Sequence, residues 1–168
     1  MSKKRWNIKK ILKEIISTVI IFFLISIVLN YIRKPEIKEN IYDYKLVDTH
    51  GATIDFSSYK GEPLVVHFWA TWCPTCKLEA SNIDALSKEY NVVTIAVSSG
   101  DNEAINAFMK EHHLSYKVIS DVEGVLAKKF HIQGYPTTLI YTKKGKLKFA
   151  EVGYSTTVGL KARLHLSN

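Results

Sequence analysis

The chain has two cysteines, which stand two residues apart in the run Trp72-Cys73-Pro74-Thr75-Cys76. A CxxC pair at the start of a helix suits dithiol-disulfide exchange, because the unpaired N–H groups and positive dipole end of the helix favour a thiolate. We therefore expect Cys73 to attack a partner disulfide and Cys76, one turn further along, to resolve the mixed disulfide. Pro74 fits the first helical turn, where its missing N–H would have no partner in any case.

The same spacing could also belong to half of a zinc site or to an inert structural disulfide. Structural zinc usually takes four Cys or His ligands. The sequence has no second CxxC, and His112 and His113 are the only obvious further ligands. We therefore expect redox chemistry with no bound metal or cofactor. A copper-binding module that uses the cysteines together with His67 or His131 remains an alternative.

The formal charge of +7 is confined to the N-terminus. Residues 1–34 contain eight basic residues and one acid, whereas residues 35–168 contain 15 of each and are neutral. A neutral domain has no electrostatic footprint for a phosphate backbone, so nucleic acid is not an expected partner.

Residues 15–32 form an uncharged, strongly apolar stretch. Eighteen residues make about 27 Å of helix, close to the thickness of a bilayer core. Six basic residues precede this stretch and two follow it directly, which keeps residues 1–14 in the cytoplasm and sends the remainder across the membrane. We expect an uncleaved anchor, because residues 29–33 offer no small-x-small cleavage site, and because a core helix would need a polar face.

A charged linker is expected at residues 33–40 and a folded domain at residues 41–168. Within the domain, short extended runs alternate with helical ones, which predicts an α/β fold: a mixed sheet with helices on both faces. The expected strands are a hairpin of residues 44–47 and 52–56, followed by 64–69, 91–97, 138–142 and 147–152. The expected helices lie near 80–90, 105–112, 122–130 with Asp121 as N-cap, and 156–166.

Residues 66–77 (VHFWATWCPTCK) resemble the active-site strand and turn of the thioredoxin superfamily, and Tyr135-Pro136-Thr137 resembles its second landmark. The resemblance covers residues 41–166 and implies a cis Pro136 that faces the cysteines, with the Tyr135 backbone pairing with an extended substrate. An X-Pro bond is cis in only about 5–6% of cases, so this expectation depends on the resemblance. The anchor, the hairpin, and a helix and strand within residues 102–119 are similar to the membrane-tethered TlpA-like and ResA-like branch.

Two further residues are candidates for acid-base chemistry. His67 stands where thioredoxins proper carry a buried aspartate that helps to deprotonate the resolving cysteine. A buried neutral imidazole could replace it through a water, or His67 could simply pack in the strand. Glu79 lies three residues after Cys76 on the same helix face and matches a glutamate of ResA-like proteins, but it could also be an exposed surface acid. The candidate partner-contacting residues are Trp72, Pro74, Thr75, Tyr135 and Thr137.

The sequence thus predicts an extracytoplasmic thiol-disulfide oxidoreductase that acts on protein thiols and disulfides. The resemblance implies a reductant that a membrane electron carrier resets. A protein disulfide oxidant or isomerase stays open, because the Pro-Thr dipeptide and the missing buried acid both alter thiolate stability. Copper delivery is less favoured, because copper-delivery proteins of this fold typically place three residues between their cysteines. A peroxidase would need a Thr-x-x-Cys motif, and Thr71 stands two residues before Cys73.

Overall fold

The computed structural model describes residues 8–32 and 40–167 and divides the chain into two units, Met1–Lys34 and Pro35–Asn168. The first unit contains one helix, α1 (Ile8–Ile32), which includes the expected anchor and begins before it. Among the described residues, no helix combines the length and apolar character that crossing a membrane requires. Most of the expected linker, residues 33–39, lies outside the described residues, as do residues 1–7.

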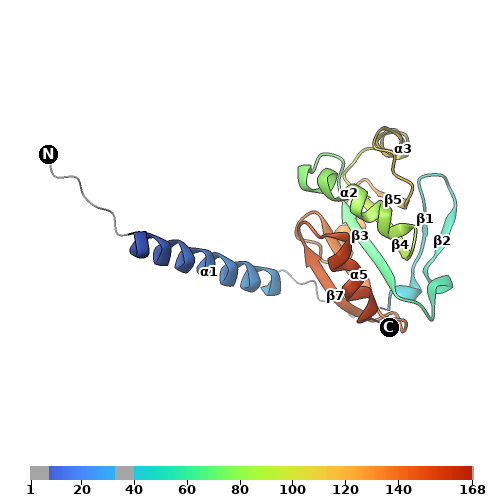
Figure 1. Ribbon diagram of the computed structural model, residues 1–168. Helices are drawn as coiled ribbons and strands as arrows, with labels where there is room; N and C mark the ends of the chain where they lie inside the picture. Colours follow the sequence, from blue (N-terminus) through green and yellow to red (C-terminus); the bar gives the residue numbers. More distant parts are fainter. Residues whose placement is uncertain (1–7, 33–39, 168) are drawn as a thin grey trace. The chain divides into compact units, whose positions relative to one another are not determined.

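The second unit is built on a five-stranded mixed sheet (Figure 1). The strand order is β5-β4-β3-β6-β7; β3, β4 and β5 run parallel, and β6 and β7 are each antiparallel to their neighbours. The strands are β3 (Leu64–Trp69), β4 (Asn91–Val97), β5 (Lys117–Asp121), β6 (Thr137–Tyr141) and β7 (Leu147–Val152). Every residue of β3 is buried, as expected for an apolar run at the centre of a sheet covered on both faces.

Three helices cover one face of this sheet. They are α2 (Pro74–Ser87), α3 (Asn102–Glu111) and α5 (Thr157–His165), and Figure 1 shows α2 and α5 together in front of the strands. Their buried side chains, among them Ile83, Ile105 and Leu160, form one core with Val65 and Trp69 of β3. Because side chains alternate along a strand, His67 points toward this same helical face.

The opposite face is covered mainly by extended chain. A hairpin of β1 (Lys45–Val47) and β2 (Thr53–Asp55) lies between two short 3₁₀ helices, η1 (Ile41–Asp43) and η2 (Phe56–Tyr59). Together with the five-residue helix α4 (Val125–Lys129), they pack on Val66 and Phe68. The thioredoxin-like α/β prediction is therefore correct, with the difference that one face is covered by a hairpin and a single short helix.

The start of α4 also differs from the sequence prediction. Asp121 is not its N-cap: it pairs with Val97 as the last residue of β5, and Gly124, at φ +68°, occupies the N-cap position. The Asp121 carboxylate still accepts hydrogen bonds from the N–H groups of Leu126 and Ala127, at 3.1 and 2.8 Å. The acid therefore satisfies the first turn of α4 from the preceding strand, because a tight turn brings strand end and helix start together.

Candidate active site

The two cysteines lie where β3 passes into α2. Cys73 is the N-cap residue of α2, and its Sγ accepts a hydrogen bond from the Cys76 N–H at 3.3 Å. Both are free thiols, and both are nearly buried, with 6% and 2% of their surfaces exposed. The local sequence explains this geometry: Pro74 occupies the first helical turn, and the Cys73 N–H bonds the Ala70 carbonyl to close the preceding turn. The Cys73 sulfur thus receives an N–H of the helix N-terminus, an environment that favours a thiolate.

The loop before β6 faces Cys73. The Tyr135–Pro136 bond is cis, as the resemblance implied, and the Cys73 thiol donates to the Tyr135 carbonyl at 3.6 Å. The Gly153 N–H donates to the Pro136 carbonyl at 2.8 Å, which ties this loop to the end of β7. The cis Tyr135–Pro136 loop therefore stands opposite the Cys73 sulfur and is held from both sides.

The expected partner-contacting residues fall into two groups. Trp72 is 58% exposed, its indole N–H donates to the Ser98 carbonyl at 3.0 Å, and its ring meets Tyr135 edge-on at 5.8 Å. Pro74 is also exposed, and Thr75 is half-buried. Thr137 differs: its side chain is buried and its hydroxyl donates to the Gly134 carbonyl at 2.8 Å, so it stabilises the proline loop from inside.

Glu79 is a fully buried acid and not an exposed one. Its Oε1 accepts a hydrogen bond from the Ser155 N–H at 3.0 Å, and its Oε2 is buried with no hydrogen-bond partner in the described structure. Burial raises the pKa of Glu79 to about 7, against a smaller lowering by the Ser155 bond. Burial also raises the pKa of Cys76, and the thiol of Cys73 and the charge of Glu79 raise it further. The Cys76 thiol is thus protonated at rest, with a titratable carboxyl within electrostatic reach.

His67 is fully buried beside the cross-strand residue Thr138, and its Nδ1 shares a hydrogen bond with the Thr138 hydroxyl at 2.9 Å. Burial lowers the pKa of His67 to about 3, so the imidazole is neutral at physiological pH. A neutral group adds no positive charge near the cysteines. The hydrogen bond to Thr138 is what a histidine that packs in the sheet would need. That His67 acts as a base for Cys76 stays a prediction.

Sequence analysis missed three residues that support this site: Thr138, Ser155 and Asn82. Thr138 could have been found from the strand register, because an antiparallel pairing of β3 with β6 places it opposite His67. Ser155 acts through its backbone N–H, which carries no side-chain signal. Asn82 donates to both the Tyr154 hydroxyl and the Ser155 carbonyl, across a sequence distance that no local pattern bridges.

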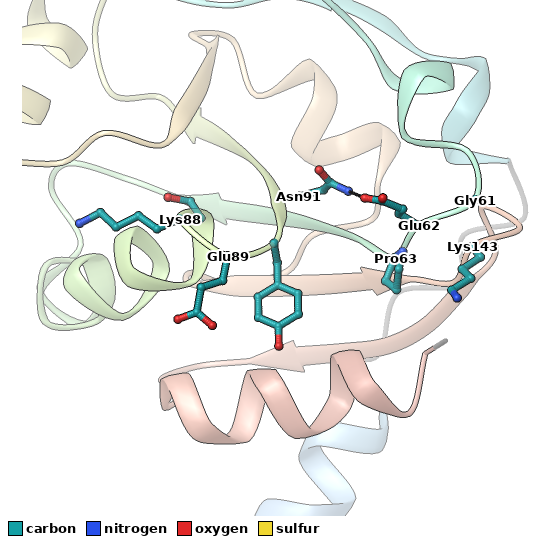
Figure 2. A pocket seen from close by; sticks show the side chains of 9 residues that line it. Gly61, Glu62, Pro63, Lys88, Glu89, Asn91 and Lys143 are labelled. Atoms are coloured by element: carbon teal, nitrogen blue, oxygen red, sulfur yellow. Dashed lines mark hydrogen bonds between the residues drawn. The ribbon is translucent and has the colours of Figure 1, made fainter.

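A polar hollow of about 620 Å³ lies at the other end of the sheet, lined by residues 61–63, 87–91 and Lys143 (Figure 2). Figure 2 shows Glu62 and Asn91 joined by a hydrogen bond within it. Pro63 precedes β3 and Cys73 follows it, so a strand of about 20 Å separates the hollow from the cysteine pair. The hollow is therefore not part of the dithiol site. Within residues 8–32 and 40–167, no cluster of three or more His, Cys, Asp or Glu side chains is placed to hold a metal ion.

Comparison with known proteins agrees with this geometry. Residues 37–150 match the AhpC/TSA family. The chain is 32% identical over 160 residues to a thioredoxin-like protein of Haemophilus influenzae, covering 94% of this chain and 95% of that protein. It is 28% identical over 151 residues to the thiol-disulfide oxidoreductase ResA of Bacillus cereus, covering 88% and 87%.

Among solved structures, the exposed lipoprotein thioredoxin Etrx1 of Streptococcus pneumoniae superposes with a TM-score of 0.64 at 26% identity, covering 73% of this chain and 98% of that one. The fold, the buried dithiol and the cis proline opposite it agree with the names of these relatives, which are called thiol-disulfide oxidoreductases or thioredoxins. The chain belongs to the AhpC/TSA family and is a thiol-disulfide oxidoreductase with a thioredoxin-like fold.

Proposed function

We propose that this protein is an extracytoplasmic, membrane-anchored reductant of protein disulfides. The observation that carries the proposal is the arrangement at the α2 N-terminus. Cys73 receives a helix N–H opposite the cis Pro136, while Cys76 behind it is kept protonated by burial next to Glu79. This arrangement separates the roles of the two sulfurs, one for attack and one for resolution.

The reaction takes place in two exchanges. The Cys73 thiolate attacks a partner disulfide, a mixed disulfide forms, and one partner sulfur leaves as a thiolate. Cys76 then transfers its proton to the ionised carboxylate of Glu79 and attacks the Cys73 sulfur, which releases the second partner thiolate. Two electrons pass to the partner, and Cys73 and Cys76 end as a disulfide. A carboxyl with a pKa of about 7 is suited to this transfer at neutral pH, because it is substantially ionised and still basic enough to accept the proton.

The charge around the sulfurs supports the proposed direction of electron flow. Dithiol proteins become strong oxidants when their reduced form is stabilised. Here the raised pKa of Cys76 and the neutral His67 work against a stabilised thiolate at the resolving position. A thiolate at this position thus gains no stabilisation, which supports the proposal that the protein donates electrons.

The proposed location rests on the sequence of the N-terminus. The uncharged residues 15–32, preceded by six basic residues, support a single anchor with the folded domain outside the cytoplasm. The Streptococcus pneumoniae relative is described as an exposed lipoprotein, which agrees with such a location. A donor outside the cytoplasm needs new electrons after each turnover, so we propose that a membrane electron carrier reduces the cysteine pair.

The reduction potential of the full-length chain tests the direction. In a glutathione redox buffer, a reductant should show a midpoint below about −230 mV, whereas strong dithiol oxidants lie near −120 mV. A midpoint near the second value would favour the oxidant or isomerase. Labelling of Cys73 by a membrane-impermeant maleimide in intact cells tests the location, with lysed cells as the reference. Labelling only after lysis would contradict an extracytoplasmic domain.

A further inference from the structure

A strap, Gly153-Tyr154-Ser155, leads from β7 to Thr156, the N-cap of α5, and bonds to both halves of the active site. At one end the Gly153 N–H bonds the Pro136 carbonyl at 2.8 Å, and at the other the Ser155 N–H bonds Glu79 Oε1 at 3.0 Å. Gly153 has φ +96°, a conformation that glycine adopts without strain. The strap therefore joins the proline loop to the buried acid.

The strap is itself held by Asn82 of α2. Its side-chain amide donates to the Tyr154 hydroxyl at 3.0 Å and to the Ser155 carbonyl at 3.1 Å. Asn82 lies three residues after Glu79, so the two side chains project from neighbouring positions on one side of the helix. The Asn82 amide thus bonds both Tyr154 and Ser155, and Ser155 is the residue that bonds Glu79.

The buried carboxyl needs such a cover. Glu79 Oε2 has no hydrogen-bond partner in the described structure and Oε1 has one, although an ionised carboxylate offers about four acceptor sites. A strap that moved away would expose these acceptor sites to solvent. The strap, through its bond to Oε1, therefore helps to keep Glu79 buried.

We propose that Asn82 is a positioning residue that latches the strap over Glu79 and thereby sets the pH range in which this carboxyl serves Cys76. The inference rests on the proposed role of Glu79 as proton acceptor and adds the element that controls it. The latch works through Glu79 and does not itself touch the reacting sulfurs.

The titratable groups around Glu79, together with its burial, determine how the pKa of Glu79 should change when the latch opens. Cys76 shares its helix, and Tyr116, just before β5, lies within electrostatic reach. On the elements that the strap connects, Glu151 of β7 and Arg163 of α5 pair with each other at 2.7 Å. Burial is the largest influence on the pKa of Glu79, and the Ser155 bond is smaller and opposite in sign. Opening the strap removes both, so the net effect is a lower pKa.

The test measures the resolving step by itself. Ellman's reagent reacts with reduced Cys73 and releases one thionitrobenzoate, and attack by Cys76 then releases a second, which stopped-flow absorbance follows between pH 5 and 9. In the wild type, the second rate should contain an inflection near pH 7 from Glu79. In the full-length Asn82→Ala variant, this inflection should move to lower pH by about one unit or more. Ser81→Ala, an exposed neighbour on the same helix, is the matched control and should leave the profile unchanged.

Two further variants distinguish the latch from general damage. Tyr154→Phe removes one of the two Asn82 contacts and should shift the inflection in the same direction by a smaller amount. In a Glu79→Gln background the inflection should be absent, and adding Asn82→Ala should then change nothing. An unchanged inflection in Asn82→Ala, with Glu79→Gln behaving as expected, would overturn the latch alone. A normal inflection in Glu79→Gln would instead overturn the proposed role of Glu79, and the latch with it.

Discussion

Replacing Glu79 by Gln should make the stability of the domain less dependent on pH. Burial raises the pKa of this carboxyl from 4.5 to about 7. Between these values the unfolded chain has released the proton and the folded chain still holds it, so the contribution of Glu79 to stability is largest below about pH 4.5 and is lost as the pH rises to about 7. Each pKa unit corresponds to about 1.4 kcal/mol, so the loss by pH 8 is about 3 kcal/mol.

Glutamine has nearly the same shape and no charge to desolvate. Its Oε1 can accept the Ser155 N–H, but its amide must occupy the site of Oε2, which has no partner, at a cost of about 1 kcal/mol. The variant should therefore be slightly less stable than the wild type at pH 4.5 and more stable by about 2 kcal/mol at pH 8. The difference between the two proteins changes by about 3 kcal/mol, and other titrating groups cancel from it.

Urea unfolding of the reduced full-length proteins at the two pH values measures this difference. The fluorescence of Trp69, which is buried against Phe108 and Tyr116, reports on the core. Glu111→Gln, which changes an exposed acid at the end of α3, is the control and should give the same difference at both pH values. If the unfolding free energies of Glu79→Gln and wild type stay parallel from pH 4.5 to 8, Glu79 does not carry a buried, raised-pKa carboxyl.

Three other outcomes are expected. Cys76→Ser should accumulate mixed disulfides with cellular proteins on non-reducing gels, whereas Cys73→Ser should accumulate none; accumulation on Cys73→Ser instead of Cys76→Ser would reverse the assigned roles. Trp72→Ala should reduce kcat/KM for a protein disulfide about tenfold and change the unfolding free energy by less than about 0.5 kcal/mol, with the rate toward Ellman's reagent as the control. Thr138→Val should destabilise the protein by about 1–3 kcal/mol in urea unfolding, because His67 Nδ1 loses its buried partner; an unchanged midpoint would mean that this hydrogen bond contributes little.

The sequence predicted those parts of the protein whose signals are local. The nearly continuous apolar run of β3 indicates a strand that is buried on both faces, and the CxxC with Pro74 indicates the start of a helix. The fold and the position of the dithiol could therefore be predicted from short stretches of sequence. The cis Pro136 was accessible only through family resemblance, because nothing in an isolated Tyr-Pro pair selects the cis form.

Properties that depend on distant segments were not predictable. Glu79 occupies a helix position that could equally face solvent, and it is buried because the strap after β7 returns to α2 and donates a hydrogen bond. Asp121 was expected to begin a helix, since the sequence does not reveal how far β5 pairs with β4. In both cases tertiary contacts determine the role of a side chain whose chemical type suits several roles.

The placement of the acid has a consequence for how this enzyme is controlled. In thioredoxins proper the buried acid lies on the central strand, where the sheet and its covering helix enclose it. Here that strand position holds a neutral His67 paired with Thr138, and the acid lies on α2 under the strap. A surface strap can open locally while the sheet stays intact, because local opening costs less free energy than global unfolding. Because the strap also bonds the Pro136 loop, a partner that shifts this loop on binding would also act on Glu79. If Glu79 accepts the Cys76 proton as proposed, proton transfer at Cys76 would then depend on partner binding.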